Sequence, residues 1–491
     1  MGKRIGRLLA AAAILSAAAA LAVIRFAGTE QPLPWNRGPQ QAAAVRSAEA
    51  GQYQSEMSGA YAFVPTTDRV LSLALHGIGD LDGMMRLLDV LDESGTKATF
   101  FLPGMRLAEE PEIAREIADR GHELGNLTLN GLDMRGLDHE RVYDEIHLAN
   151  EVIWKAAGLF PRYVSTRNGE YTDDVRRAAA QLGMEAVIAG NLRIGARTAG
   201  EDLRSLIRSR MTRGGIIEVI VDQYPDPEAA VRAVVETAAE IGYELVTLSS
   251  LMAHQETLVR AEEIPGYDAA AIQPDYRRDA FRVVRKVQTD DRVVSLTFDD
   301  WGSDYTVTKT LDILERYGVK ATFFLRAGGV EYNPNLARAI ARAGHEVANH
   351  TYAHAEITKM TPEELQQDIV RAHRVLTEAL QQRPAMLFRP PRREIDERTA
   401  RVVAAAGYPV IVNYDVTAFD WDASRSAKDL LRTIREKTGP GSIIVLHILD
   451  DLSTIEALPS IIEYLTDQGY RFLTVSELLA RYPAETEMQS S

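Results

Sequence analysis

The chain has 491 residues, 46% hydrophobic and 25% charged, which is enough for two or three globular domains and excludes a wholly disordered or fibrous protein. Its formal net charge of -15 argues against a nucleic-acid partner, because phosphate binding needs clustered Lys and Arg. It contains no cysteine, so disulfides and thiolate metal sites are excluded and any metal must be held by His, Asp and Glu.

The N-terminus has the pattern of an export segment. Lys3, Arg4 and Arg7 precede an apolar run over residues 8–24, an order that keeps the N-terminus in the cytoplasm and sends the rest of the chain outward. Residues 1–26 are therefore predicted to be either a cleaved signal peptide or an uncleaved membrane anchor, and a buried first helix is the less favoured alternative. Both favoured readings predict an extracytoplasmic protein, secreted or membrane-anchored and associated with the cell wall.

The sequence repeats itself after a linker predicted for residues 27–61. KATFFL at Lys97–Leu102 recurs 223 residues later at Lys320–Leu325, and GHE at Gly121–Glu123 recurs at the same spacing at Gly344–Glu346. Identities held in register over such a span indicate two homologous domains. The predicted organisation is a first domain at 62–252, a linker at 253–287, a second domain at 288–482 and a tail at 483–491.

Strand and helix patterns alternate in the second copy. Strands are predicted for the short apolar runs, and a capped helix is predicted to start at Thr361, which is followed by Pro362 and Glu364. Such a series implies an α/β fold with a parallel sheet, closed or nearly closed, whose active groups collect at the carboxyl ends of the strands. The predicted strands are Val293–Phe298, Val319–Leu325, His345–Asn349, Ile443–Leu446 and Phe472–Val475.

Polar residues follow several of these strands. Asp299 and Asp300 follow the first, His350 and His354 follow the third, and His447 follows a later one. Singly, such residues are more often turn, cap or surface positions. Two imidazoles and a carboxylate, however, are a common ligand set for a catalytic metal that keeps a position open for water, and the joint placement of these residues at strand ends favours such a site.

The second copy carries five ordered motifs: TFDD at Thr297–Asp300, NHTYAH at Asn349–His354, FRPP at Phe388–Pro391, FDW at Phe419–Trp421 and VLH at Val445–His447. In this order they resemble the motifs of polysaccharide deacetylases, the NodB-homology carbohydrate esterases of family four. The resemblance implies two tandem distorted (β/α) barrel domains of NodB-homology type, preceded by an N-terminal apolar helix.

The resemblance implies roles for the first three motifs. Asp300, His350 and His354 match the family's metal triad, which implies one divalent ion, zinc first, with Co²⁺, Mn²⁺ or Ni²⁺ as alternatives. Asp299 matches the general base that takes a proton from the attacking water. Arg389 matches the residue that keeps this base ionised and oriented.

The later motifs imply the remaining groups and some departures from the family. His447 matches the general acid, and Trp421 and Leu446 match the walls of the acetyl pocket. Arg392, with Arg393 after it, stands where the family commonly has Tyr-Gly, whose backbone amide helps form the oxyanion hole. Arg392 is therefore placed in the substrate pocket, in a cleft expected to be locally more basic. The Asp expected to orient the acid is replaced by Thr417, with Asp415 and Asp420 as substitutes.

The first copy lacks this chemistry. In register with the second, its positions carry residues that cannot bind a metal, so a folded pseudo-domain without a metal site is expected, in which the GHE histidine is structural. The replacements are His76 for Asp299, Gly77 for Asp300, Leu127 for His350, Gly131 for His354, Thr166 for Arg389 and Ile220 for His447.

The sequence therefore predicts a metal-dependent hydrolase that removes N-acetyl groups from a cell-wall or extracellular polysaccharide, with peptidoglycan as the favoured substrate. Two alternatives stay open at this stage: an O-acetyl esterase on an acetylated polysaccharide, and a non-catalytic surface protein that binds glycan or acts as a scaffold. The expected partners are the polysaccharide and, if the N-terminal segment is uncleaved, the membrane. The oligomeric state is left open.

Overall fold

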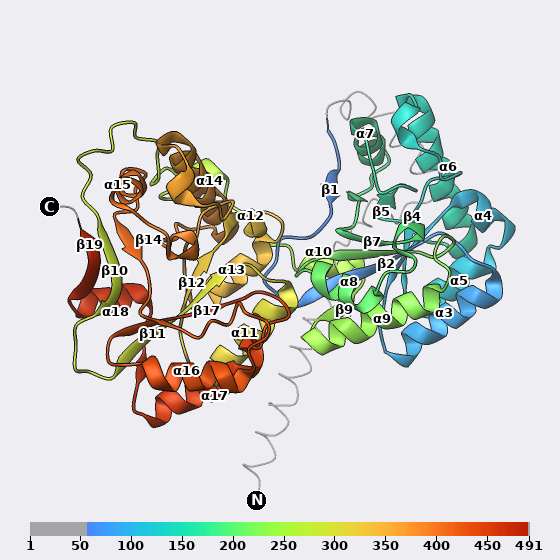
Figure 1. Ribbon diagram of the computed structural model, residues 1–491. Helices are drawn as coiled ribbons and strands as arrows, with labels where there is room; N and C mark the ends of the chain where they lie inside the picture. Colours follow the sequence, from blue (N-terminus) through green and yellow to red (C-terminus); the bar gives the residue numbers. More distant parts are fainter. Residues whose placement is uncertain (1–55, 490–491) are drawn as a thin grey trace, which may run out of the picture. The chain divides into compact units, whose positions relative to one another are not determined.

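The computed structural model describes residues 56–489, so the predicted export segment at 1–26 lies outside the described residues (Figure 1). A search of the described part of the chain finds no helix with the length and apolar character needed to cross a bilayer. The described residues form two compact units. Residues 56–61 and 100–189 make the smaller unit, and residues 62–99 and 190–489 make the larger one.

The smaller unit contains a parallel array of short strands in the order β1-β6-β5-β4-β3. The strands are β1 (Gly59–Tyr61), β3 (Thr99–Leu102), β4 (Glu123–Asn126), β5 (Tyr163–Ser165) and β6 (Ala186–Ile188). The helices are α4 (Gly104–Glu109), α5 (Glu112–Asp119), α6 (His139–Ala157) and α7 (Asp173–Gln181).

The larger unit holds the remaining elements of the first copy. Strand β2 (Val70–His76) pairs in parallel with β8 (Ile216–Ile220) and β9 (Glu244–Val246), and β8 also pairs with β7 (Leu192–Ile194). Every residue of β2 is buried, as expected for a strand covered on both faces. The accompanying helices are α3 (Leu81–Glu93), α8 (Leu203–Arg210), α9 (Pro227–Ile241) and α10 (Leu248–Ala253).

The larger unit also holds the whole second copy, built on a ten-stranded sheet. The order β17-β10-β15-β14-β13-β12-β11 returns to β17, because β11 pairs with β17 as well, so the sheet closes into a distorted barrel. The strands are β10 (Arg282–Val287), β11 (Val293–Asp300), β12 (Thr322–Leu325), β13 (Glu346–Asn349), β14 (Ala385–Phe388), β15 (Val410–Val412), β16 (Val416–Thr417), β17 (Ser442–His447), β18 (Arg471–Phe472) and β19 (Ala484–Gln489).

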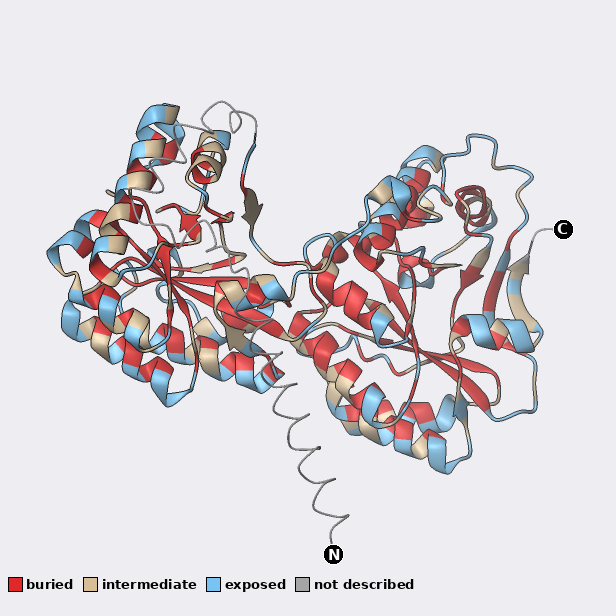
Figure 2. Cartoon of the chain, turned by 180° about the vertical axis from the view of Figure 1, so that it is seen from behind, coloured by how far each residue is buried: buried red, intermediate tan, exposed pale blue. Residues whose placement is uncertain are grey.

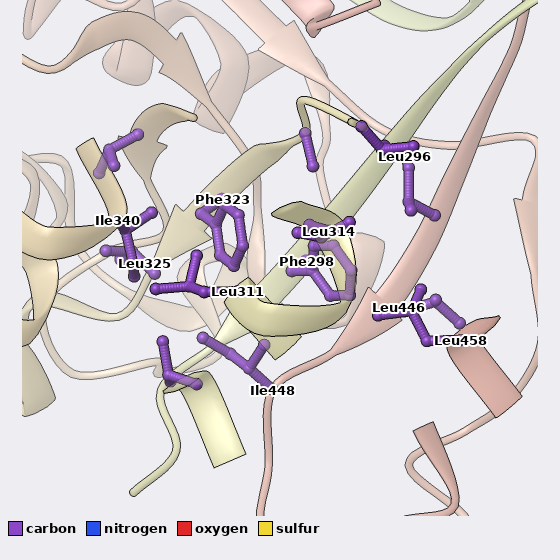
Figure 3. Packing of buried hydrophobic residues seen from close by; sticks show 14 of the residues in the cluster. Leu296, Phe298, Leu311, Leu314, Phe323, Leu325, Ile340, Leu446, Ile448 and Leu458 are labelled. Atoms are coloured by element: carbon purple, nitrogen blue, oxygen red, sulfur yellow. The ribbon is translucent and has the colours of Figure 1, made fainter. Parts of the chain in front are cut away.

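Amphipathic helices cover the outside of this barrel. Their buried faces pack on the outward side chains of the strands, while their other faces are exposed (Figure 2). Phe298 and Phe323 from adjacent strands stack with ring centroids 4.9 Å apart and belong to the same buried cluster as Leu311 and Leu314 (Figure 3). The helices are α11 (Asp304–Arg316), α12 (Ala327–Val330), α13 (Pro334–Arg342), α14 (Pro362–Leu380), α15 (Glu397–Ala405), α16 (Ala427–Lys437), α17 (Thr454–Asp467) and α18 (Val475–Arg481).

The predicted α/β fold with two parallel-sheet domains is confirmed, and the helix predicted at Thr361 begins there with a capping box to Glu364. Three segments differ from the sequence prediction. Residues 484–489 form β19 instead of a tail, because they pair antiparallel with β10, and β10 itself lies in the segment expected to be a linker. The strand predicted at Phe472–Val475 ends at Phe472, because Thr474 caps helix α18.

Candidate active site

The end of β11 places two consecutive carboxylates in different surroundings. Side chains alternate along a strand, so Phe298 faces the helices while Asp299 faces the barrel interior, where it is only 4% exposed. Asp299 is in register with His447 on β17, and parallel pairing directs both side chains to the same face. Asp300 follows with a left-handed backbone, φ +77°, which turns its side chain toward the next loops.

A buried arginine holds Asp299. The guanidinium of Arg389, which follows β14, is completely buried, and its Nη1 donates to Oδ1 of Asp299 at 2.6 Å and to Thr297 at 2.8 Å. Its Nε donates to the carbonyl of Val412 at 2.9 Å, which fixes the plane of the group. Burial raises the pKa of Asp299 above its ordinary value, although the charge of Arg389 opposes that rise. The carboxylate of Asp299, held by Arg389, is therefore suited to accept a proton.

Asp300, His350 and His354 converge as the sequence predicts. One ligand atom from each lies within 4.8 Å of the others, with Nε2 of His354 3.4 Å and Nε2 of His350 3.9 Å from Oδ1 of Asp300. Nδ1 of His350 lies 2.8 Å from the carbonyl of Arg389 and donates to it, which leaves the Nε2 lone pair free to bind a metal. Burial lowers the pKa of His350 to about 3, so the imidazole is neutral. The residues thus fit a divalent ion with an open coordination position.

The two histidines do not share a helix face, although their spacing allowed it. The segment after β13 is an irregular loop in which Thr351 and His354 have positive φ values of 68° and 56°. Side chains hold this shape: Oδ1 of Asn349 accepts from the amide of Thr351 at 2.8 Å, and the Thr351 hydroxyl accepts from the amide of His354 at 3.0 Å. The rings approach edge to face with centroids 5.0 Å apart.

Asp420 orients His447. Oδ1 of Asp420 lies 2.9 Å from Nδ1 of His447, and its other oxygen accepts from the His447 amide at 2.7 Å and from Thr454 at 2.8 Å. Burial disfavours the charged imidazolium, but the hydrogen bond and charge of Asp420 outweigh it and raise the pKa of His447. The substitute expected for Thr417 is therefore Asp420. Asp415 instead accepts from Ser442 and Ile443, each at 2.8 Å.

Of the two residues predicted to wall the acetyl pocket, Trp421 lies beside the proposed acid and Leu446 does not. Trp421 is 44% exposed and meets the His447 ring edge to face at 5.2 Å, beside the acid. Leu446, in contrast, is buried in the helix-side core near Leu458 (Figure 3), so its assignment to the pocket is wrong. Alternation along β17 places Val445, two residues before His447, on the inner face instead.

The two arginines after the FRPP motif do not make the cleft more basic, contrary to the sequence expectation. Nη1 of Arg392 donates to Glu356 at 2.7 Å, and Arg393 pairs with Glu487 of β19. Both arginines are left-handed, with φ values of 56° and 63°, a conformation that costs about 1–2 kcal/mol for a residue with a side chain. Arg392 remains about half exposed at the rim.

The loops after β11 and β17 approach each other too closely for a side chain between them. A Cβ at Gly302 would lie 1.9 Å from the carbonyl oxygen of Ile448. The next residue, Ser303, caps α11 and donates from its hydroxyl to Asp450 at 2.6 Å. This contact fixes the loop that carries Asp300 against the loop that carries His447.

Comparison with known proteins agrees with this arrangement. The family model for polysaccharide deacetylase matches residues 77–187 and 286–411. A peptidoglycan-N-acetylglucosamine deacetylase of Bacillus cereus is 33% identical over 201 residues, which cover 40% of this chain and 92% of that protein. The chain belongs to the polysaccharide deacetylase family. It is accordingly a hydrolase of that family, and the split match fits the two-copy arrangement.

One further relative and one solved structure are also similar to this chain. A bifunctional xylanase/deacetylase of Pseudobutyrivibrio xylanivorans is 36% identical over 191 residues, which cover 38% of this chain and 30% of that protein. The solved structure of a pseudoenzyme of carbohydrate esterase family four from Bacillus anthracis is 28% identical, with a TM-score of 0.38, and the match covers 42% of this chain and 71% of that one.

The first deacetylase-like copy keeps the backbone of the metal loops without their ligands. Gly77 has φ +92° where Asp300 has +77°, and Gly131 has φ +65° where His354 has +56°. Thr128 is left-handed like Thr351, accepts from the amide of Gly131 at 3.1 Å, and donates its own amide to Asn126 at 2.6 Å. Among residues 56–489, the only group of three side chains placed to hold a metal is the one in the second copy.

The GHE histidines have the structural role expected for them. His122 and His345 each meet a phenylalanine ring, Phe100 and Phe323 respectively, at a centroid distance of 5.3 Å and near-perpendicular planes. Burial lowers the pKa of His345 to about 4, and its Nδ1 accepts from the Ala321 amide at 3.2 Å. A histidine ring packed edge-on against a phenylalanine in both copies serves the fold.

Proposed function

We propose that residues 288–482 remove acetyl groups from the N-acetyl sugars of an extracytoplasmic polysaccharide, with peptidoglycan as the substrate. The observation that carries the proposal is the meeting of a proton acceptor, a metal-ligand triad and a proton donor at one end of the barrel: Asp299, then Asp300 with His350 and His354, and His447. The activity named for the relative in Bacillus cereus supports the same substrate.

Amide hydrolysis needs an activated water, stabilisation of the oxyanion and a proton for the departing amine. A divalent ion held by the triad, which we expect to be zinc, would polarise the acetyl carbonyl and lower the pKa of the attacking water. Asp299 accepts the proton of that water. Arg389 donates to its carboxylate and is itself held by the hydroxyl of Thr297. The buried arginine also keeps Asp299 from turning away from the reacting atoms.

His447 supplies the proton for the leaving group. Its Nδ1 is held by Asp420, so Nε2 is the atom that transfers a proton to the amine nitrogen. The raised pKa favours the protonated imidazole, the form that a general acid requires. Trp421, beside His447, is proposed to form one wall of the acetyl pocket, and Val445, on the inner face of β17, is proposed to form another. Arg392 is proposed to contact the glycan at the rim of the site.

An O-acetyl substrate uses the same groups, and the xylanase/deacetylase relative supports it as the second candidate. The deciding experiment measures acetate release by the metal-loaded protein from peptidoglycan, chitooligosaccharide and acetylxylan. We expect release from peptidoglycan and at least a thousandfold loss in Asp299→Asn. No acetate from any of the three would refute the hydrolase proposal and favour a glycan-binding protein, whereas release from acetylxylan alone would identify an O-acetyl esterase.

In this proposal the first copy, residues 62–252, has no catalytic activity, and both copies lie outside the cytoplasm. The export segment proposed for residues 1–26 would deliver them there, either cleaved or retained as an anchor. Fractionation of cells that express a C-terminally tagged chain, followed by N-terminal sequencing, tests this. Tagged protein in the cytoplasm would contradict it.

A further inference from the structure

The turn at Arg392–Arg393 is strained and lies next to the catalytic groups. Arg392 and Arg393 both adopt the left-handed backbone conformation, which glycine adopts without steric cost and residues with a Cβ do not. The turn begins three residues after Arg389, which holds Asp299 through its guanidinium and His350 through its carbonyl. A strained conformation of this kind persists only where its surroundings determine it.

Two carboxylates from separate segments of the chain pair with the arginines of this turn. Glu356, two residues after His354, accepts from Arg392 at 2.7 Å and is shared with Lys359. Glu487, on the C-terminal strand β19, pairs with Arg393. The Arg393 guanidinium also lies over the ring of Tyr414, 5.5 Å from its centroid.

Glu487 reaches the catalytic arginine by a second route. Its other oxygen accepts from Nδ2 of Asn413 at 2.9 Å, and the carbonyl of Asn413 faces Nη2 of Arg389 at 3.4 Å. The guanidinium of Arg389 also lies near the ring of Tyr414, 5.6 Å from its centroid. The carboxylate of Glu487 therefore contacts the strained turn directly and is linked to Arg389, the residue that supports the base, through Asn413.

We propose that Glu487, presented by strand β19, is a positioning residue that together with Glu356 keeps the turn Arg392–Arg393 in its left-handed form. The consequence is that strand β19 supports the catalytic groups. The amide of Arg393 already donates to the carbonyl of Pro390 at 3.2 Å, so the amide of Arg392, at the position matched to the oxyanion hole, is the donor that the clamp would hold for the reaction. The inference rests on the proposed deacetylation, since the turn is expected to act on the reaction and not on folding.

The central test is the variant Glu487→Gln, with Glu485→Gln as a matched control. Glu485 lies on the same strand and pairs with an arginine, Arg285, that does not touch the turn. We expect kcat for acetate release to fall about tenfold or more in Glu487→Gln with KM within twofold, because donors that act on the transition state change kcat. The control should keep the wild-type kcat.

Relief of strain provides the second arm. Glycine adopts φ 63° without cost, so Arg393→Gly should make the clamp unnecessary. Adding it to Glu487→Gln should restore kcat to within about threefold of the wild type, which loss of a general structural contact would not allow. Wild-type kcat in Glu487→Gln, an equal loss in Glu485→Gln, or no recovery in the double variant would each overturn the proposal.

A readout independent of activity separates this inference from the proposed function. Hydrogen exchange of a peptide covering residues 389–395 should be faster in Glu487→Gln than in the wild type and unchanged in Glu485→Gln. If the wild type releases no acetate but the exchange difference is present, the clamp stands and the deacetylase proposal fails. Equal exchange in all three proteins contradicts the clamp whatever the activity.

Discussion

The carboxylate of Asp420 holds the imidazole of His447 at 2.9 Å and its backbone amide at 2.7 Å. These two hydrogen bonds fix both the ring and the end of strand β17 that carries it. The carboxylate also raises the pKa of the ring, because a buried carboxylate next to a histidine favours the protonated form. Asp420 thus sets the orientation of the proposed acid and contributes most to the rise of its pKa, to which Asp299 and Asp300 add.

Asp420→Asn should therefore lower kcat by about a hundredfold, within the range usual for general acid catalysis. Asp420 raises the pKa of His447, so its loss lowers that pKa, and the alkaline limb of the kcat profile should move to lower pH. Asp415→Asn is the control, since that carboxylate bonds Ser442 and Ile443. An unmoved alkaline limb in Asp420→Asn would exclude His447 as the group whose protonation sets it.

Arg389→Lys should act on the opposite limb. Lysine cannot reproduce the contacts to Val412, Thr297 and Asp299 together, because it lacks the planar fork of donors. The pKa of Asp299, already raised by burial, should rise further, and the acid limb should move to higher pH. Arg338→Lys removes a different buried arginine and should reduce only thermal stability. A kcat/KM profile of both variants distinguishes the two effects.

His350→Ala should remove the metal. Elemental analysis should give about one divalent ion per wild-type chain and nearly none in the variant, because the site loses one of three protein ligands. Asp299→Asn serves as the control, since it abolishes turnover while keeping the ion. Two ions per wild-type chain would mean that the first copy also binds metal.

Gly302→Ala tests the close approach of the two catalytic loops. Its Cβ would lie 1.9 Å from the Ile448 carbonyl oxygen, so the loops must separate. We expect at least a tenfold loss of kcat and a destabilisation of about 1–3 kcal/mol, the usual cost of overpacking. Gly439→Ala is the control, because no atom lies within 4 Å of a Cβ there. Thermal melting and acetate release in parallel would show whether the two alanines differ.

The strand ends and their polar residues were predictable from the sequence, because apolar runs mark buried strands and parallel strands bring their carboxyl ends to one edge. Leu446 was assigned wrongly for a related reason: a one-residue shift along a strand moves a side chain to the other face. Counting two residues back from His447 leads to Val445. Asp420, which directly precedes Trp421, was only one of two substitutes, since its reach to His447 depends on how a loop turns.

Contacts distant in sequence could not be predicted. Strand β19 has little hydrophobic signal, and its pairing with β10 joins segments about two hundred residues apart. The pairing of Glu487 with Arg393 follows from that register. The same holds for Glu356 and Arg392, whose meeting depends on two irregular loops.

The retained loop backbone of the first copy has a consequence for how the second copy acquires its ion. Thr128 and Gly131 form the same local hydrogen bond as Thr351 and His354 in a copy with no ligands, so this loop does not need an ion to fold. In the second copy the ion is therefore expected to bind to a site that is already formed, unlike in small domains that fold only on binding zinc. Chelation should abolish turnover while leaving circular dichroism unchanged, and activity should return as fast as the ion diffuses in.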